Sequence, residues 1–265
     1  MKGDILFYLP PDYPWADRLL TFDTLDSTND RLKALARQGA PEGTAILADR
    51  QTGGRGRLGR SFHSPGGQGI YLSLLLRPQC PPQALMHLTC AVAVSMCRAL
   101  EAATAICPGI KWTNDLVSGK RKLGGILTEL GLSPQGQVDY AILGIGINCC
   151  QVPEDFPKEI RDMAGSLAMV CGHSVDRHQV AAAMLEALHG LSRTLLTEKE
   201  EILRAYRQNC VTLGQDISVL RGDTVRHGHA LDVDDSGALV VQYTDGTQEA
   251  VNSGEVSIRG MYGYL

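Results

Sequence analysis

The sequence predicts an α+β protein in which a helix-flanked β-sheet precedes a small, strand-rich C-terminal module. Residues 69–77 alternate between apolar and other side chains, which indicates a strand with one face in the core. Residues 82–103 are apolar on most of a helix surface, which is typical of a buried helix. After Leu213-Gly214, five short strand-like segments lie between residues 217 and 259, and this pattern predicts a small barrel.

The other elements follow from periodicity and from the turn residues between them. Strands are predicted at 19–22, 44–49, 110–112, 121–129 and 138–148, and in the C-terminal part at 217–221, 225–233, 238–243, 247–251 and 256–259. Helices are predicted between Ser27 and Gly39, from Asp176 onward and at 198–210. Ser27 with Asp30, and Asp176 with Gln179, are spaced as N-terminal caps, and Gly39 is a C-terminal stop. We therefore expect two domains, 1–214 and 215–265.

Composition excludes several classes of protein. The chain has 265 residues and a net charge of −4, which argues against general affinity for nucleic acid or membrane surfaces. No apolar run reaches the roughly 18 residues of a membrane span. The first 15 residues contain Pro10, Pro11 and Pro14 and are too short for a domain of their own.

The cysteines predict a reducing compartment. There are eight, none in a C-x-x-C pair, and no signal peptide precedes them, so we expect free thiols in a cytoplasmic protein. His227-Gly-His229 and Cys171-Gly-His173 are too sparse for a structural metal site, and none is predicted.

One segment, residues 50–60, stands out as a candidate site and is called the Arg/Gly loop below. It holds Arg50, Arg55, Arg57 and Arg60, separated by glycines and without an acid. Arginines beside exposed backbone N–H groups suit a carboxylate or phosphate. We expect the loop to be mobile without ligand, because it has few apolar side chains to bury and its charges repel.

The sequence disfavours two other interpretations of this loop. Its glycines at 54, 56 and 59 match the dinucleotide fingerprint, but that motif needs a helix opening inside it, and Ser61 to Gly67 is not a helical sequence. An Arg/Gly segment of RNA-binding tails lies in a low-complexity tract, whereas apolar segments flank this one.

Further polar residues have both a structural and a functional interpretation when they are taken alone. Ser27 and Thr28 fit a helix cap, and Lys111 to Asp115 fits a polar turn after a strand. Lys122 precedes two glycines and an apolar strand, which suggests that its ammonium faces something specific. Gly144 and Gly146 indicate that a ligand or a backbone segment comes close to the strand that contains them.

Four motifs together carry a family resemblance. They are Gln-x-x-Gly-Arg-Gly-Arg-x-Gly-Arg from Gln51, Lys-Trp-Thr-Asn-Asp from Lys111, Arg-Lys-Leu-Gly-Gly-Ile-Leu from Arg121, and Gly-Ile-Gly-Ile-Asn from Gly144. In this order and spacing the chain resembles biotin–protein ligase (biotin–[acetyl-CoA-carboxylase] ligase). The resemblance implies a mixed sheet flanked by helices, in the class II synthetase-like biotin/lipoate ligase fold, and an SH3-like C-terminal barrel. Thr113 stands where the family usually has proline, which leaves the geometry of that turn open.

The resemblance also implies site residues. Biotin would be bound by Ser27, Thr28, Asn29, Gln51, Gly54, Arg55, Gly56, Arg57, Lys122 and Gly125. ATP and the adenylate would be bound by Arg57, Arg60, Phe62, Lys111, Asn114, Asp115 and Asn148. Lys122 and Arg57 would be catalytic, and Mg²⁺ carried with ATP would lie near Asp115.

The implied activity is the formation of biotinyl-5′-AMP, followed by transfer of the biotinyl group to a lysine of a biotin carboxyl carrier protein. A lipoate or octanoate ligase is the nearest alternative, and a non-catalytic biotin- or nucleic-acid-binding regulator is a more remote one. Some relatives carry an N-terminal winged helix that binds DNA. This sequence does not show it, so we predict no DNA role and no membrane role, and the resemblance leaves a homodimer open.

Overall fold

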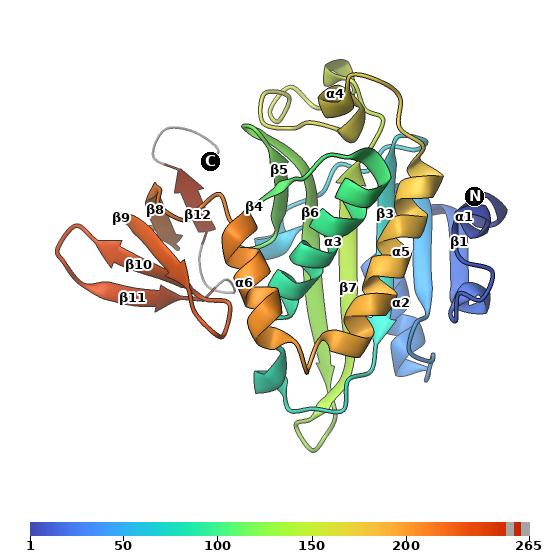
Figure 1. Ribbon diagram of the computed structural model, residues 1–265, viewed down its shortest axis with the longest axis horizontal. Helices are drawn as coiled ribbons and strands as arrows, with labels where there is room; N and C mark the ends of the chain where they lie inside the picture. The colour runs from blue at the N-terminus through green and yellow to red at the C-terminus, as the bar shows by residue number, and fades with distance from the viewer. Residues whose placement is uncertain (253–256, 261–265) are drawn as a thin grey trace.

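The protein is described here by a computed structural model that covers residues 1–252 and 257–260, and this part of the chain forms two β-sheets (Figure 1). The larger sheet has the strand order β1-β2-β3-β7-β6-β5-β4. Its strands are β1 (Leu19–Leu25), β2 (Ala45–Gln51), β3 (Gly69–Leu76), β4 (Gly109–Lys111), β5 (Asp115–Ser118), β6 (Arg121–Leu132) and β7 (Val138–Asn148). Only β1 and β2 pair in parallel among these strands, and the other neighbours are antiparallel. The predicted mixed sheet is confirmed.

Helices cover both faces of this sheet. Figure 1 shows α3 (Leu88–Thr104) and α5 (Arg177–Thr194) side by side on one face, with α6 (Lys199–Asn209) beside them. Helix α2 (Thr28–Arg37) packs on the opposite face, where Leu32 and Ala36 form a second apolar cluster with Ile46, Leu75 and Ile142. The sheet is therefore buried on two sides, which explains why every residue of β3 is buried.

The smaller sheet has the order β11-β10-β9-β8-β12 and lies next to α6 (Figure 1). Its strands are β8 (Asp216–Arg221), β9 (Thr224–Val233), β10 (Leu239–Tyr243), β11 (Gln248–Val251) and β12 (Ser257–Gly260). All neighbours pair antiparallel, as in the SH3-like module that was predicted. The exact domain boundary at residue 214 stays a prediction, two residues before β8 begins.

The predicted helix caps are present. Ser27 accepts a hydrogen bond from the backbone N–H of Asp30, and the Asp176 carboxylate accepts from the N–H groups of His178 and Gln179. Gly39 follows α2 with a φ of +87°, the left-handed conformation that glycine favours at a helix end.

Several elements, including β5, differ from the sequence-based expectation. Helix α1 (Lys2–Tyr8) precedes the prolines and buries Ile5 against α5, so the N-terminal segment contributes to the core. The predicted helix at 82–103 is divided into a 3₁₀ turn, η3 (Pro82–Leu85), and α3. The short helix α4 (Leu167–Cys171) lies in a region without a predicted element. Further 3₁₀ turns are η1 (Ala16–Arg18), η2 (Arg57–Gly59) and η4 (Pro153–Asp155).

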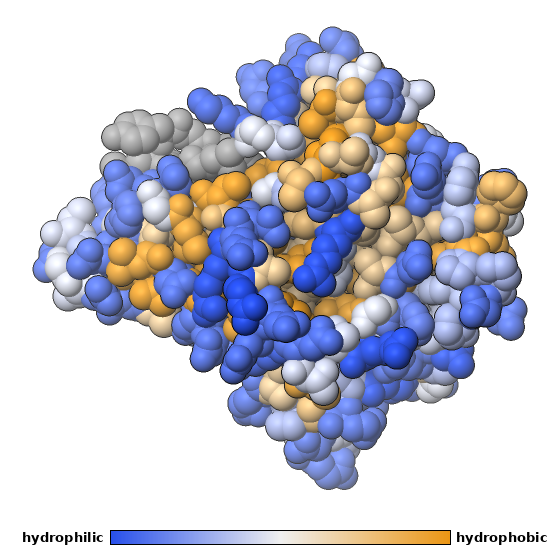
Figure 2. All heavy atoms as spheres, viewed as in Figure 1, coloured by the Kyte–Doolittle hydropathy of each residue, from blue (hydrophilic) through white to orange (hydrophobic). Residues whose placement is uncertain are grey.

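One segment, Pro82–Thr104, is long and apolar enough to cross a membrane by composition alone, which corrects the expectation that none would be. However, 72% of its most apolar window is buried inside the fold. Figure 2 shows that hydrophilic and apolar side chains are mixed on the face over α3 and α5. Helix α3 is therefore a core helix.

Candidate active site

A cavity of about 650 Å³ lies on the α2 side of the larger sheet, beneath the Arg/Gly loop. Its volume is in the range of small-molecule sites. The lining includes most of the predicted site residues, namely Ser27, Thr28, Asn29, Gln51, Arg55, Gly56, Arg57, Arg60, Phe62, Lys111, Asn114, Asp115, Lys122 and Gly125. Segments more than 130 residues apart along the chain thus meet around one space, from Ser27 to Met163.

The Arg/Gly loop is folded back on itself over this cavity. The Gly56 N–H donates to the Arg60 carbonyl at 2.7 Å, and the Phe62 N–H donates to the Gly54 carbonyl at 2.9 Å. The turn η2 between them contains Leu58 and Gly59 at φ values of +55° and +72°. The predicted mobility of the unliganded loop is not tested by this conformation and stays a prediction.

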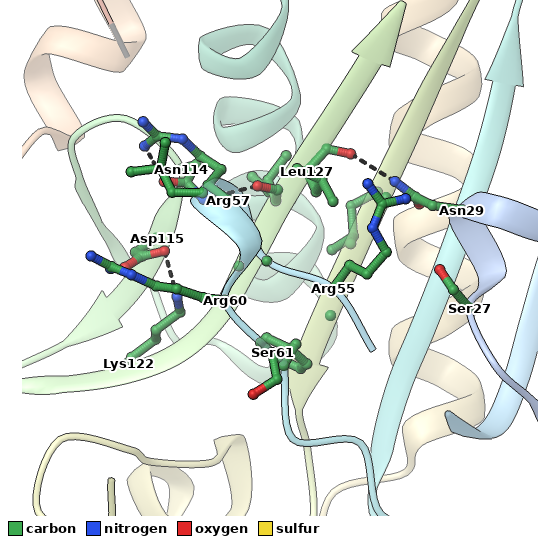
Figure 3. Close-up of a pocket in the computed structure, with 18 of the residues that line it drawn as sticks. Ser27, Asn29, Arg55, Arg57, Arg60, Ser61, Asn114, Asp115, Lys122 and Leu127 are labelled. Atoms are coloured by element: carbon green, nitrogen blue, oxygen red, sulfur yellow. Dashed lines mark hydrogen bonds and ion pairs between the residues drawn. The ribbon is translucent and has the colours of Figure 1, made fainter. Parts of the chain in front are cut away.

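The loop divides its arginines between two ends of the cavity. Figure 3 shows Arg55 directed toward Asn29, whereas Arg57 and Arg60 lie on the other side, near Asn114 and Lys122. One end of the cavity is therefore bounded by neutral polar groups and an arginine. The other end collects several cations.

Hydrogen bonds organise the neutral end before any ligand is bound. The Gln51 side-chain carbonyl accepts from the Thr28 N–H at 2.8 Å and from the Thr28 hydroxyl at 3.0 Å. The Gln51 amide donates to Ser64 Oγ at 3.1 Å. Gln51 thus joins the first turn of α2 to the segment after the Arg/Gly loop, and it holds both in a fixed relation.

Asn29 is held on both sides of its amide. Its Nδ2 donates to Glu129 Oε2 at 2.8 Å and to the Leu127 carbonyl at 3.3 Å, and its Oδ1 accepts from Ser73 Oγ at 2.6 Å. Because these bonds use both polar atoms of the amide, Asn29 shapes the wall of the cavity. Its predicted contact with biotin stays a prediction.

The cationic end is built on two pairs. Lys122 Nζ lies 2.5 Å from Asp115 Oδ1, and Arg57 Nη1 donates to Asn114 Oδ1 at 3.0 Å. Asn114 is fixed in turn, since its Nδ2 donates to the Ile126 carbonyl at 2.9 Å. Burial lowers the pKa of the Arg57 guanidinium, and the nearby Asp115 carboxylate opposes that shift. A partly desolvated arginine interacts more strongly with an anion than an exposed one does.

Two glycines of β7 make room for protein side chains. A Cβ at Gly146 would lie 2.6 Å from the Phe62 ring, and a Cβ at Gly144 would lie 2.1 Å from Asn29 Oδ1. A close approach occurs at both glycines, but the approaching groups are the side chains of Phe62 and Asn29, whereas a ligand or backbone was expected. Phe62 is also 6.4 Å from the Tyr71 ring in an edge-on contact.

We expect Gly144→Ala to destabilise the protein by about 1–3 kcal/mol, as overpacking does. The added methyl group would displace Asn29, which makes three hydrogen bonds to its surroundings. The free energy of unfolding, from thermal or denaturant unfolding, measures this effect. Gly190→Ala is the matched control, because nothing lies within 4 Å of its added methyl group. Equal behaviour of the two variants would contradict the packing role.

Two predicted residues lie outside the cavity lining. Gly54 is buried, and a Cβ there would lie 2.5 Å from the Phe62 carbonyl oxygen. Asn148 is buried beneath the site, and its Nδ2 donates to the Gly165 carbonyl at 2.9 Å and to the Lys122 carbonyl at 3.4 Å. Both support the site from behind, and their ligand contacts stay predictions.

The turn that carries Asn114 and Asp115 begins with a cis peptide bond between Trp112 and Thr113. Lys111, before it, is buried and lines the cavity. The Trp112 indole donates to the Gly237 carbonyl at 3.0 Å, and the Tyr206 hydroxyl donates to the Thr113 carbonyl at 3.0 Å. The second sheet and α6 therefore contact the turn from outside.

Sequence reasoning missed several members of the site. It gave no site role to Leu58, Ser61, Trp112, Ile126, Leu127, Ile145 and Met163, and it marked Gly144 and Gly146 only as places of close approach, although all nine line the cavity. It also missed Ser73, Glu129 and Lys33, which hold Asn29 and Arg55 in place. A lone acid in an apolar strand is the signal that marks Glu129, whereas Met163 comes from a segment without any recognisable pattern.

Comparison with known proteins matches this arrangement. Residues 21–148 match the biotin/lipoate A/B protein ligase family, and residues 212–259 match the biotin protein ligase C-terminal domain. The bifunctional ligase/repressor BirA of Bacillus subtilis is 36% identical over 87% of this chain and 71% of its own length. The chain belongs to the biotin/lipoate A/B protein ligase family.

Within this family, other relatives are similar over most of both chains. The biotin–[acetyl-CoA-carboxylase] ligase of Mycobacterium tuberculosis is 31% identical over 87% of this chain and 85% of its own. The biotin protein ligase of Aquifex aeolicus, solved in complex with biotin and ATP, is 33% identical with a TM-score of 0.76 and covers 91% of this chain and 98% of its own. The expected ligase fold is confirmed.

Proposed function

We propose that this protein activates biotin with ATP and transfers the biotinyl group to a lysine of a biotin carboxyl carrier protein. The observation that carries this proposal is the division of one cavity by the Arg/Gly loop. Neutral hydrogen-bonding groups around Thr28 and Gln51 suit an uncharged ureido ring, and the cations Arg57, Arg60 and Lys122 at the other end suit a carboxylate and phosphates. The similar Aquifex aeolicus ligase was solved with biotin and ATP bound.

The first half-reaction brings two anions together. A carboxylate oxygen of biotin attacks the α-phosphorus of ATP, the bond to the β-phosphate bridge breaks, and pyrophosphate leaves with the electron pair. Lys122 and Arg57 face the space where these anions meet and lower the repulsion between them. Arg60, Lys111 and Asn114 line the same end and would hold the nucleotide, with Phe62 beside its base.

In the second half-reaction the mixed anhydride must be protected from water, and this matters more than any additional catalytic group. The ε-amine of the acceptor lysine attacks the acyl carbon of the mixed anhydride, and AMP leaves. A loop that covers the cavity excludes water from this reactive intermediate. The closed Arg/Gly loop is suited to that purpose.

Mg²⁺ fits this site as an ion carried by ATP. Asp115 offers one carboxylate at the cationic end, and the described residues contain no group of three or more His, Cys, Asp or Glu side chains that would hold a metal alone. Magnesium is commonly bound by one or two carboxylates together with substrate phosphates. Bound there, it would neutralise phosphate charge, with Asp115 shared between the ion and Lys122.

We expect the protein to catalyse exchange of labelled pyrophosphate into ATP only when biotin is present. This exchange tests the first half-reaction without knowledge of the acceptor. Lipoate and octanoate are the comparison substrates, because the family description includes lipoate beside biotin and a lipoate or octanoate ligase is the nearest alternative from the sequence. Exchange with lipoate and none with biotin would assign the alternative substrate. If none of the three acids supports exchange, the protein binds its ligand without activating it.

The names of the relatives and the state of the cysteines indicate the acceptor protein and the cellular compartment. Relatives named for acetyl-CoA carboxylase support a carboxylase carrier domain as the acceptor. All eight cysteines are free thiols, five of them buried, which supports a cytoplasmic location. We further propose that the protein acts without binding DNA. Analytical ultracentrifugation tests whether the protein forms a homodimer, and a DNA mobility-shift assay tests the absence of DNA binding.

A further inference from the structure

Arg55 differs from the other arginines of the Arg/Gly loop in the direction of its side chain. Figure 3 shows it turned away from Arg57 and Arg60, toward Asn29. Its Nη1 pairs with Asp30 Oδ1, and its Nη2 lies 3.0 Å from Glu129 Oε1. Arg55 is thus already engaged by two carboxylates of the protein. A substrate anion would have to compete with both.

These two carboxylates form a closed cluster with a lysine. Lys33 Nζ lies 2.7 Å from Glu129 Oε1 and 3.3 Å from Asp30 Oδ1, so two cations bridge the same two acids. Burial alone raises the pKa of Glu129, but hydrogen bonds from Lys33 and Asn29 outweigh it and lower the pKa overall. Lys33 thus holds both acids where they face Arg55. The two cations and two carboxylates of the cluster have a net charge of zero.

The partners of Arg55 belong to the body of the domain. Asp30 and Lys33 lie in the first two turns of α2, and Glu129 lies in β6, the neighbour of β7 in the larger sheet. Arg55 itself belongs to the loop that covers the cavity. A bond from a loop to two rigid elements restricts the loop at that point.

We propose that Arg55 is a latch whose side chain holds the Arg/Gly loop closed against Asp30 and Glu129, and so retains the adenylate between the two half-reactions. The inference that closure retains the adenylate rests on the proposed function. The family resemblance assigned the Arg55 position to biotin, whereas the latch assigns its side chain to the α2–β6 edge and makes Asp30 a positioning residue.

The latch is weak enough to release the loop. The Arg55 and Asp30 side chains are 40% and 44% exposed, so water and salt screen their attraction. Loss of one such pair changes the ratio of closed to open loop by about two- to five-fold. The loop can therefore open for substrates and for the acceptor, while the pair shifts its equilibrium toward the closed state.

The test measures the rate at which the adenylate is released from the Asp30→Asn variant. Enzyme is supplied with biotin and MgATP but no acceptor, and hydroxylamine in solution traps released biotinyl-5′-AMP as the hydroxamate with release of AMP. We expect escape to be about two- to five-fold faster than in the wild type. The matched control is Asp139→Asn, which removes an exposed acid that lies 3.1 Å from Arg77 at the other end of β7. The control should escape at the wild-type rate.

Two further readouts separate a latch from a general loss of stability. The first readout compares Asp30→Asn, Arg55→Met and the double variant that carries both changes. The adenylate should escape from the double variant no faster than from the more affected single variant, because both changes break the same pair. Salt should accelerate escape from the wild type and have less effect on Asp30→Asn. Additive effects, or an escape rate of Asp30→Asn equal to the control, would overturn the latch.

A third readout is independent of the proposed function. Trypsin cleavage after Arg57 and Arg60, without any ligand, should be faster in Asp30→Asn than in Asp139→Asn. Biotin with ATP should protect the wild-type loop further. If the wild type fails biotin-dependent exchange but this order of cleavage holds, the function is wrong and the latch stands. Equal cleavage in both variants rejects the latch, whatever the exchange assay shows.

Discussion

Lys122→Ala is expected to slow biotin-dependent pyrophosphate exchange by about 10²-fold or more, the scale for loss of a charge contact in a transition state. The Lys122 ammonium lies 2.5 Å from Asp115 Oδ1, within the cavity where biotin's carboxylate and the α-phosphate would meet. Its removal has a double effect. The anions lose a positive partner, and the Asp115 carboxylate loses its ion pair with Lys122.

The main chain at this position does not depend on the side chain. The Lys122 N–H donates to the Met163 carbonyl at 2.7 Å, and its carbonyl accepts from Gly165 at 2.9 Å, so the strand keeps its place in the variant. Lys120→Ala is the matched control, an exposed lysine in the preceding turn, and should stay within about two-fold of wild type. Asp115→Asn combined with Lys122→Ala should recover part of the loss. An exchange rate of Lys122→Ala within three-fold of wild type would remove its catalytic role.

Local sequence patterns predicted most elements of the fold because they depend on nearby residues. The caps at Ser27 and Asp176 and the alternation in β3 arise within one element, and each was found. Helix α1 was missed because the prolines that follow it dominate the segment, and because Ile5 is recognised as a core residue only through its packing near α5. Strand β5 was taken for part of a turn, since only pairing with β4 and β6 makes four residues a strand.

The site was predicted through its motifs, and the unpredicted part consists of contacts between motifs. Gly144 lies opposite Asn29, 115 positions earlier in the chain, and no local pattern carries that information. Asn148 belongs to a recognisable motif, but its amide supports the backbone of Lys122 from below the cavity. The pairing of Arg55 with Glu129 likewise joins a loop to a strand that sequence alone does not bring together. Motifs thus identified the residues of the site, whereas the fold determines the direction of each side chain.

Arg57→Ala is expected to reduce adenylate formation to a similar extent, by about 10²-fold, for a different reason. The Arg57 guanidinium is more shielded from water than Arg55 is, and this burial lowers its pKa, while Asn114 fixes its position at 3.0 Å. A cation that is partly desolvated and held in place pays little reorganisation when negative charge develops beside it. Arg57→Lys should restore only part of the rate, because an ammonium cannot bond Asn114 and a phosphate in the same planar arrangement.

Single-turnover formation of the adenylate measures this effect apart from product release. Arg50→Ala is the matched control, since Arg50 is exposed at the end of β2 and does not line the cavity. The cause must also be separated from loss of loop closure. Arg57→Ala should slow formation of the adenylate, whereas Asp30→Asn should mainly accelerate its escape. If Arg57→Ala instead forms the adenylate at the wild-type rate and only releases it faster, then Arg57 holds the loop and does not stabilise the transition state.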